Sequence, residues 1–242
     1  MNVVRVKIKG EYKRFPLLTS TDFRDLLFIS SDMENKTNEE CQQILDEVLD
    51  MLYPGYSRLE QEHIFTKVYC MSFGKNVIKV SFDGGSGVTF MVIHDMELNN
   101  EYKIGDITIG FKYPKNRMTE DVSQFIGCID YVVQGDEKYE WCALSEETRN
   151  DILDIIEVKD IENIVNMLTH SCDVSIKKHK INTLLPLFKI LFSKAELTTF
   201  YKTNYIMAKH SINIDTLMKS TPMERTIYIA LLADELKKAK KK

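Results

Sequence analysis

Histidine and cysteine are the residues whose spacing could first reveal catalytic or metal-binding chemistry in this chain. His170 lies two residues before Cys172, and a thiol activated by an imidazole is a common nucleophile. Side chains so close in sequence rarely have the required geometry, and no third group is evident to orient them. The other histidines form no zinc-binding pair, and no two of the five cysteines have Cys-x-x-Cys spacing. We therefore predict no catalytic residue, no cofactor and no metal ligand, although a metal site built from distant residues stays open.

Two further stretches contain residue types that bind phosphate or transfer protons. Asp83–Gly87 reads DGGSG, but a phosphate-binding loop leads into a helix, whereas the following Val88–Ile93 alternates as a strand does. We interpret DGGSG as a hairpin turn. The acids in 136–160 would need a pocket with divergent pKa values to catalyse proton transfer. We interpret Asp136 and Glu137 as part of a solvated loop. Asp151, Asp154, Glu157 and Asp160 are interpreted as a solvated helix face, and docking of a basic partner on that face is the alternative.

Aromatic residues offer a different kind of candidate. The chain contains 12 Phe and 11 Tyr, and many of the tyrosines fall near expected turns or helix ends. Such side chains combine apolar area with a polar group and often anchor protein interfaces, although ordinary residues at the edge of a core explain them equally well. The candidate interface residues are Tyr113, Tyr139, Trp141, Asp151, Asp154, Tyr201 and Tyr205.

Composition limits the class of protein. The chain has 242 residues, 44% of them hydrophobic and 28% charged, which is typical of a folded globular protein. The net charge of −4 disfavours nucleic-acid binding, because proteins that bind nucleic acid usually have a basic excess. We interpret the basic run at 237–242 as a helix end and a solvated tail. Scattered cysteines, an N-terminus without a signal-peptide core and a short apolar run at 184–192 predict a soluble, intracellular protein with no membrane span.

The amino-terminal elements that must position these residues are a hairpin and then helices. Val3–Ile8 alternates polar and apolar residues, which predicts a strand, and Tyr12–Phe15 is expected to pair back on it. One helix is expected after Thr19. A second is expected to follow the capping box Thr37–Glu40, and a short third helix is expected from Leu59 to about Tyr69.

The hydrophobic period then changes to two. Val77–Phe82, Val88–Ile93 and Ile107–Phe111 have β-branched and aromatic residues in alternation. They predict an antiparallel β unit at roughly residues 72–114.

From Met118 onward the pattern is mainly helical. We expect a helix from Thr119 through Val133, further helices within Ser145–Leu168, and helices that begin at the capping boxes Ser193–Glu196 and Thr221–Glu224. The residues that the last helix is expected to bury are Met223, Ile227, Ala230 and Leu231.

Together these elements predict an α+β fold. Residues 1–116 are expected to form an N-terminal portion with short helices and the antiparallel β unit, and residues 117–242 a mainly α-helical portion. Because no Gly-, Ser- or Pro-rich linker separates the two, they are also compatible with one shared core.

The order of several short motifs resembles a known family. In chain order they are Phe15-Pro16-Leu17-Leu18-Thr19, Ser72-Phe73-Gly74, Asp83-Gly84-Gly85, Ile104-Gly105-Asp106-Ile107, Tyr113-Pro114, Cys128-Ile129-Asp130 and Gly135-Asp136-Glu137. Over roughly residues 12–160 this order is similar to the baseplate hub proteins of T4-like contractile-tailed bacteriophages. That family includes a hub subunit and a related hub-assembly factor. The carboxyl region, with Thr221–Arg225, is similar more loosely.

The resemblance implies a non-enzymatic role in virion assembly, as a hub subunit or a hub-assembly factor. The implied partners are other phage baseplate hub proteins, and a homo-oligomer stays open; nucleic acid and membrane are not expected. The implied location is the host cytoplasm during assembly, with the baseplate of the virion tail as a later location. Two alternatives stay open: a chaperone for tail segments, and a small nucleotide- or metal-dependent enzyme that uses acids in 136–160.

Overall fold

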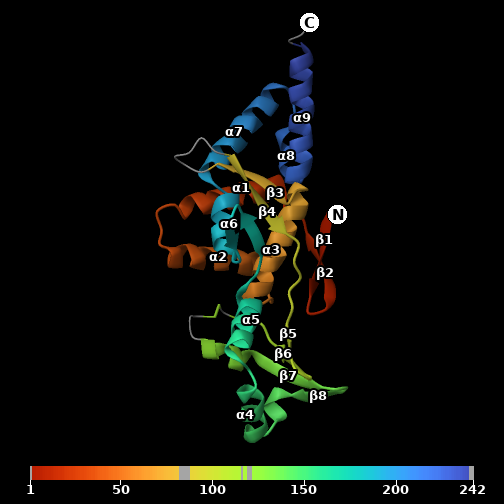
Figure 1. Cartoon of the computed structure of the whole chain (residues 1–242). Helices are drawn as coiled ribbons and strands as arrows, with labels where there is room; N and C mark the ends of the chain where they lie inside the picture. Colours follow the sequence, from red (N-terminus) through yellow and green to blue (C-terminus); the bar gives the residue numbers. More distant parts are fainter. Residues whose placement is uncertain (1, 82–87, 116, 119–121, 240–242) are drawn as a thin grey trace.

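The computed structural model describes residues 2–81, 88–115, 117–118 and 122–239. Figure 1 shows an elongated molecule with three tiers: an arm that contains the C-terminus, a central layer, and a lower module at the opposite end. Each tier has its own cluster of buried hydrophobic side chains, and the central cluster is the largest.

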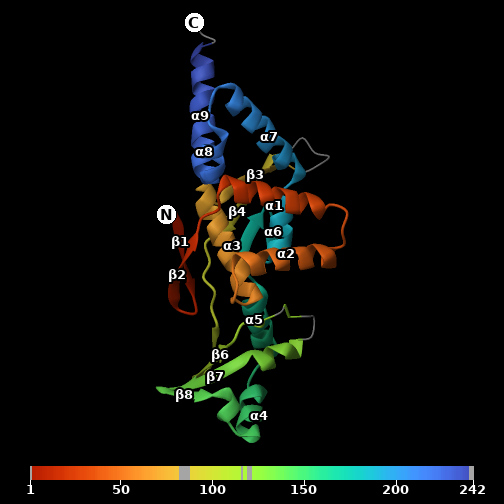
Figure 2. The same cartoon turned by 180° about the vertical axis from the view of Figure 1, so that it is seen from behind.

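The helices of the central layer begin where the local sequence favours a helix N-terminus. Thr19, Thr37 and Ser57 each accept a hydrogen bond from the backbone N–H three residues on, and the acid at that position bonds back to the cap. Figure 2 shows α1 and α2 lying across one face of this layer. The helices of this layer are α1 (Ser20–Asp32), α2 (Asn38–Leu52), α3 (Arg58–Phe73) and α6 (Leu184–Leu191).

An antiparallel sheet in the order β10-β9-β4-β3 packs on these helices. Alternate side chains face the helices, and Met91, Ile93 and Val174 are buried there. The DGGSG segment that was expected to join β3 and β4 lies outside the described residues, but the two strands pair as the hairpin requires. The strands are β3 (Val77–Ser81), β4 (Val88–His94), β9 (Asp173–Ile176) and β10 (His179–Ile181).

A separate hairpin lies beside α3 (Figure 1). It is formed by β1 (Val3–Ile8) and β2 (Glu11–Pro16), as the sequence predicted. Its alternate residues Val4, Val6 and Ile8 are buried in the central core.

The lower module is a second antiparallel sheet, in the order β5-β6-β7-β8, with helices packed against it. Its buried core includes Ile109, Phe111, Ile129 and Ile164. The elements are β5 (Glu101–Ile104), β6 (Ile107–Phe111), the 3₁₀ helices η1 (Val122–Cys128) and η2 (Trp141–Ala143), β7 (Ile129–Gln134), β8 (Glu137–Glu140), α4 (Glu146–Asp154) and α5 (Val158–Thr169).

The helix expected from Thr119 through Val133 is wrong. Residues 122–128 form η1, and Ile129–Gln134 is strand β7, which pairs with β6 and β8. The apolar spacing of Phe125, Ile129 and Val133 fits a helix, but as a strand the segment pairs with β6 and β8 and buries Ile129 and Val132 in the sheet.

The arm contains α7 (Lys194–Lys209), α8 (Ile214–Lys219) and α9 (Pro222–Ala239). Met207, Leu217 and Leu232 form its small core. Thr221 and Glu224 form the predicted capping box, with Thr221 N donating to Glu224 Oε2 at 2.8 Å. At Ser193 the helix begins as expected, but the serine side chain makes no capping hydrogen bond.

Helix α3 connects the three tiers. Leu59 at its start belongs to the lower core, and Phe65 in its middle belongs to the central core. At its end Gly74 has φ +62°, and a Cβ placed there would lie 2.5 Å from Met223 Sδ of α9. The helix was predicted as a short one ending near Tyr69, but it continues to Phe73 and is buried on almost every side.

The predicted fold class is confirmed: antiparallel sheets with short helices precede a carboxyl region made of α6–α9. The β block at 72–114 divides between two sheets, because β3 and β4 join β9 and β10 through the β4–β9 pair, whereas β5 and β6 join β7 and β8 through the β6–β7 pair. The division of the chain at residue 116 stays a proposal.

Candidate protein-interaction surfaces

The first candidate surface is a set of exposed aromatic rings across α1 and α7. Tyr201 and Tyr205 are one helical turn apart on α7, and they are 48% and 69% exposed. The Tyr201 ring lies 6.1 Å from the ring of Phe28 on α1, which is also exposed. The structure therefore brings two of the candidate residues together and adds Phe28, which the sequence did not single out.

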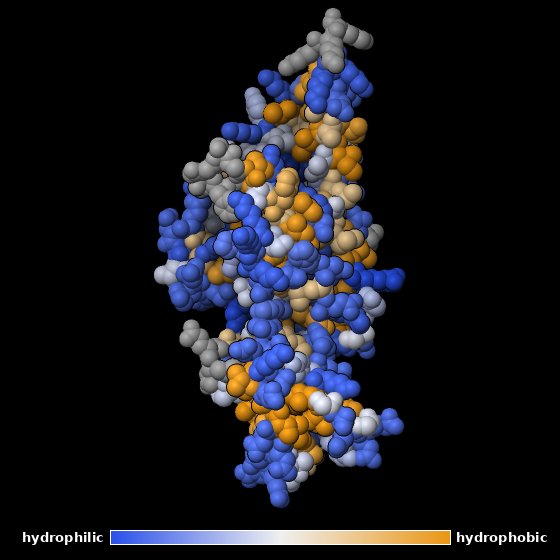
Figure 3. All heavy atoms as spheres, viewed as in Figure 1, coloured by the Kyte–Doolittle hydropathy of each residue, from blue (hydrophilic) through white to orange (hydrophobic). Residues whose placement is uncertain are grey.

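The second candidate surface is a row of apolar side chains along α9. Met223, Ile227 and Leu231 recur every four residues and are 46%, 50% and 58% exposed, and Tyr228 lies beside them. Figure 3 shows apolar residues gathered along α9. The prediction that this helix buries Met223, Ile227 and Leu231 is wrong.

The row is exposed because α9 packs by its other side. Arg225 is buried, its guanidinium lies 4.2 Å from the centre of the Phe200 ring, and Nη2 donates to Asn204 Oδ1 at 2.8 Å. Burial lowers the pKa of the Arg225 guanidinium. Leu232 is buried against α7 and α8, and Ile229 and Leu236 of α9 pack on the same arm core, so α9 has a second apolar stripe and packs by that one.

The third candidate surface is the acidic end of the lower module. Asp151 and Asp154 are exposed on α4, and Tyr139 on β8 is 41% exposed. Trp141 is half-buried and packs against the lower core. The chain brings these four residues into one module, whereas Tyr201 and Tyr205 lie in the arm at the other end (Figure 1).

Tyr113 lies apart from all three surfaces. It is 8% exposed and packs in the lower core, and burial is the main cause of its raised pKa. The position of Tyr113 therefore fits an ordinary core residue, which was the alternative to an interface anchor.

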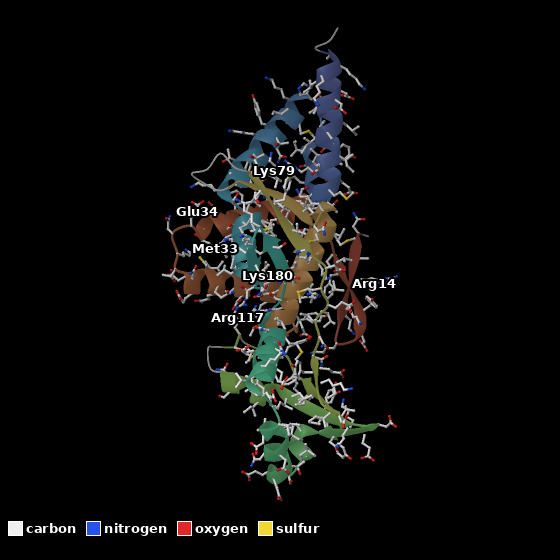
Figure 4. The ribbon with its side chains drawn as sticks, viewed as in Figure 1. Arg14, Met33, Glu34, Lys79, Arg117 and Lys180 are labelled. Carbon is white, nitrogen blue, oxygen red and sulfur yellow. The ribbon has the colours of Figure 1, made fainter. Side chains whose placement is uncertain are left out.

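A buried polar cluster joins the central layer to the lower module. Glu62 on α3 pairs with Arg117, accepts a hydrogen bond from the Ser171 hydroxyl and accepts the Leu184 N–H at 3.2 Å. Arg117 also pairs with Asp46 at 3.0 Å, and Figure 4 labels it where α5 meets the central layer. Leu184 is the first residue of α6, and its N-cap Thr183 makes no side-chain capping bond. The carboxylate of Glu62 therefore caps α6 from another helix.

The histidine and cysteine pair of the sequence is not brought into a reactive geometry. His170 Nε2 lies 3.3 Å from the Asn182 amide, while the Cys172 thiol points to Ile181 O at 3.7 Å. Burial raises the pKa of Cys172 to about 12, so its thiol stays protonated and weakly nucleophilic.

The described residues contain neither a metal-binding cluster nor a membrane-spanning helix. No group of three or more His, Cys, Asp or Glu side chains in that part of the chain is placed to hold a metal ion. Among the same residues, no helix combines the length and apolar composition that crossing a bilayer requires.

Two family models match the chain. Residues 1–183 match the family described as T4 bacteriophage base plate protein. The chain belongs to this family. Residues 191–237 match the C-terminal domain of the baseplate hub assembly protein Gp51. No curated protein and no solved structure matches the chain.

The two matches coincide with the tiers of the structure. The base plate match covers the lower module and nearly all of the central layer, and it ends at the residue before α6. The hub-assembly match covers α7, α8 and nearly all of α9, which is the arm. The matches confirm the resemblance stated above and indicate a role in assembly of the phage baseplate hub, with association with the tail baseplate.

Sequence reasoning missed the buried polar residues. Glu60, Gln61, Glu62 and His63 are consecutive, and each is at most 2% exposed. Four consecutive polar residues on a helix normally include a solvated face. The only signal in the sequence was the absence of an amphipathic stripe in Arg58–Phe73, which is a property of helices buried all round.

Proposed function

We propose that this protein assembles the phage baseplate hub without covalent chemistry, by binding other hub proteins through its C-terminal arm. The observation that carries the proposal is the exposed row of Met223, Ile227 and Leu231 on α9, within the segment that matches the Gp51 C-terminal domain. A contiguous apolar row that stays exposed on a helix is typical of a surface that a partner covers. The arm meets its partner after synthesis in the host cytoplasm.

The arm suits this role because it is held rigidly at its base. Ser20 N of α1 donates to Ser220 O at 2.8 Å, and the Thr21 hydroxyl donates to Met218 O at 3.0 Å. Met223 packs on Gly74 at the end of α3. These contacts pre-organise the apolar row, so little conformational entropy is lost when a partner binds.

Co-expression with the other hub proteins of the same phage tests the proposal. We expect a complex on size-exclusion chromatography with light scattering, and Ile227→Asp with Leu231→Asp should weaken it by at least about tenfold, since a charge placed in an apolar contact opposes binding. Met51→Asp is the matched control, because Met51 is 72% exposed on α2, away from the arm. A complex that withstands the double substitution would contradict binding through the arm, and no complex in any pairing would contradict the proposed function.

The copy number of this protein in purified virions distinguishes a hub subunit from a hub-assembly factor. A hub subunit is present in the tail at a fixed copy number by mass spectrometry. An assembly factor is absent from the virion, while its loss still prevents hub formation.

A further inference from the structure

The outer face of the central sheet, which points away from the helices, exposes apolar side chains. Val77, Val88 and Phe90 are 47%, 52% and 59% exposed. The strand register places them on one face, with Val77 opposite Val92 and Phe90 opposite Lys79. Adjacent exposed apolar residues on a sheet, bordered by polar ones, mark an interaction surface.

The strands of this sheet and the residues next to them are basic, and two of their lysines lie on this face. Residues 75–81, 88–94 and 173–181 contain five lysines and one aspartate. Lys79 lies across from Phe90, and Lys180 lies across from Ser175, which in turn lies across from Val92. Both lysines are exposed and make no ion pair within the described part of the chain (Figure 4). An occupant of this face must therefore be both acidic and apolar.

The chain itself contains a surface of that kind. Residues 134–163 contain ten acidic and three basic side chains, a net charge of −7. At the corner between α4 and α5, Ile155 and Val158 are 48% and 74% exposed, and Asp154 and Glu157 flank them. This corner matches the sheet face in both respects, with apolar residues at the centre and the opposite charge around them.

We propose that the outer face of the β3–β4–β9–β10 sheet binds the α4–α5 corner of a second copy of this chain. The corner lies at the lower end of the elongated molecule and the sheet lies in its middle, so the contact joins two copies (Figure 1). Because the two surfaces differ, the contact is head to tail and repeats until it closes into a ring or ends in an open row. The proposal goes beyond binding of hub proteins and uses neither the row on α9 nor the rings of α1 and α7.

Sedimentation of the purified full chain tests the contact. We expect a monomer of 28.1 kDa at low concentration and larger species as concentration rises. The association is expected to weaken between about 0.05 M and about 0.5 M salt, because salt screens charges that are several ångströms apart. Lys79→Glu with Lys180→Glu, and separately Asp151→Lys with Asp154→Lys, should each weaken it by at least about tenfold.

Mixing the two reversed variants gives the deciding measurement. Neither variant is expected to associate with itself. The lysine variant retains the native acidic corner and the aspartate variant retains the native sheet face, so the mixture is expected to form complexes through these two surfaces. Restored association also shows that both variants are folded. Lys202→Glu with Lys209→Glu changes the net charge equally on α7 and is expected to leave self-association unchanged.

A chain that stays monomeric at every concentration would overturn the proposal and leave the sheet face to an acidic partner of another kind. Association that persists in either reversed variant, or that is not restored by mixing, would also overturn it. These outcomes are independent of the hub-binding test, which reads a complex with other proteins and a different surface.

Discussion

Glu62 is the residue on which the packing of α3, α6 and the lower module converges. Its carboxylate is buried, and it bonds Arg117, Ser171 and the first N–H of α6. A buried acid is tolerated only where its oxygen atoms are paired or accept hydrogen bonds, and here every partner comes from a different segment. The ion pair itself is weak evidence for stability, but removal of one partner leaves the other groups unsatisfied.

We therefore expect Glu62→Gln to lower the free energy of unfolding by about 3 kcal/mol, since Arg117 loses its buried partner and the α6 cap loses its charge. Urea unfolding measures the change. Glu162→Gln is the matched control, because Glu162 is exposed on α5 and its loss should change stability by less than about 0.5 kcal/mol. Equal effects of the two substitutions would show that the Glu62 contacts contribute nothing.

His63, the next residue, makes stability depend on pH. It is 2% exposed, it faces the Ser171 carbonyl at 3.4 Å, and its charged neighbours are Lys67, Asp95 and Glu97. Burial, with a smaller contribution from Lys67, lowers its pKa to about 4. The unfolded chain takes up this proton near pH 6.5 and the folded chain only near pH 4, so stability is complete above pH 6.5 and falls as pH decreases toward 4.

Between pH 7 and pH 5 this single group is expected to remove about 2 kcal/mol from the free energy of unfolding. In His63→Gln, the decrease in the free energy of unfolding between pH 7 and pH 5 should be smaller than in the unchanged protein by about 2 kcal/mol. This difference does not depend on how stable the variant is at pH 7. Chemical unfolding at the two pH values measures both. His210→Gln, at an exposed histidine, should retain the full loss, and a His63→Gln protein that retains it as well would contradict a neutral buried imidazole.

At the scale of single elements, two similar capping-box sequences at helix N-termini differ in the hydrogen bonds that they form. Ser193–Glu196 and Thr221–Glu224 both fit a capping box, but only Thr221 makes the bonds, with Glu224 N donating to its hydroxyl at 3.2 Å. We expect Thr221→Ala to cost about 1 kcal/mol and Ser193→Ala only a few tenths. Thermal unfolding of the two variants checks the difference, and a larger cost at Ser193 would contradict it.

Local signals predicted most of the elements. The boxes at Thr37 and Thr221 and the alternation in Val3–Ile8 act through residues adjacent in the chain, so the sequence suffices to place them. Strand β7 is different, because its partner β6 lies 18 to 27 residues away, and the spacing of the β7 residues by itself also fits a helix. The one local signal is the Gly135-Asp136 turn that joins β7 to β8, where Gln134 pairs with Glu137.

The candidate surfaces were predictable to the same limited extent. Tyr201 and Tyr205 are exposed aromatic residues, as an interface anchor requires, whereas Tyr113 is buried. The exposed row on α9 was not predicted, because α9 has two apolar stripes and only the one with Ile229, Leu232 and Leu236 faces the arm core. Which stripe faces the core depends on contacts such as that of Arg225 with Phe200, between residues 25 positions apart.

At the scale of the whole molecule, three cores lie in the described part of the chain, and α3 contacts all three tiers. The lower module meets the central layer through Leu59 and the Glu62–Arg117 pair, and the arm meets it through Phe200 and Gly74. These junctions are narrow compared with the continuous central core. Segments with few contacts to the rest open at lower free energy than the core does.

We therefore expect native-state hydrogen exchange to show α3 and β4 as the most protected elements, with the lower module and the arm opening separately. Two large-to-small variants test the separation. Ile109→Ala, in the lower core, should accelerate exchange in β6 and β7 far more than in α9, while Met207→Ala, in the arm core, should do the reverse. Each substitution truncates a buried side chain at a cost of about 2–5 kcal/mol, so the two variants are matched in severity and each serves as the control for the other.

If both variants accelerate exchange in all elements equally, the molecule unfolds as one unit. Its three cores would then be coupled through α3 strongly enough that a partner bound to the arm also stabilises the acidic corner at the opposite end.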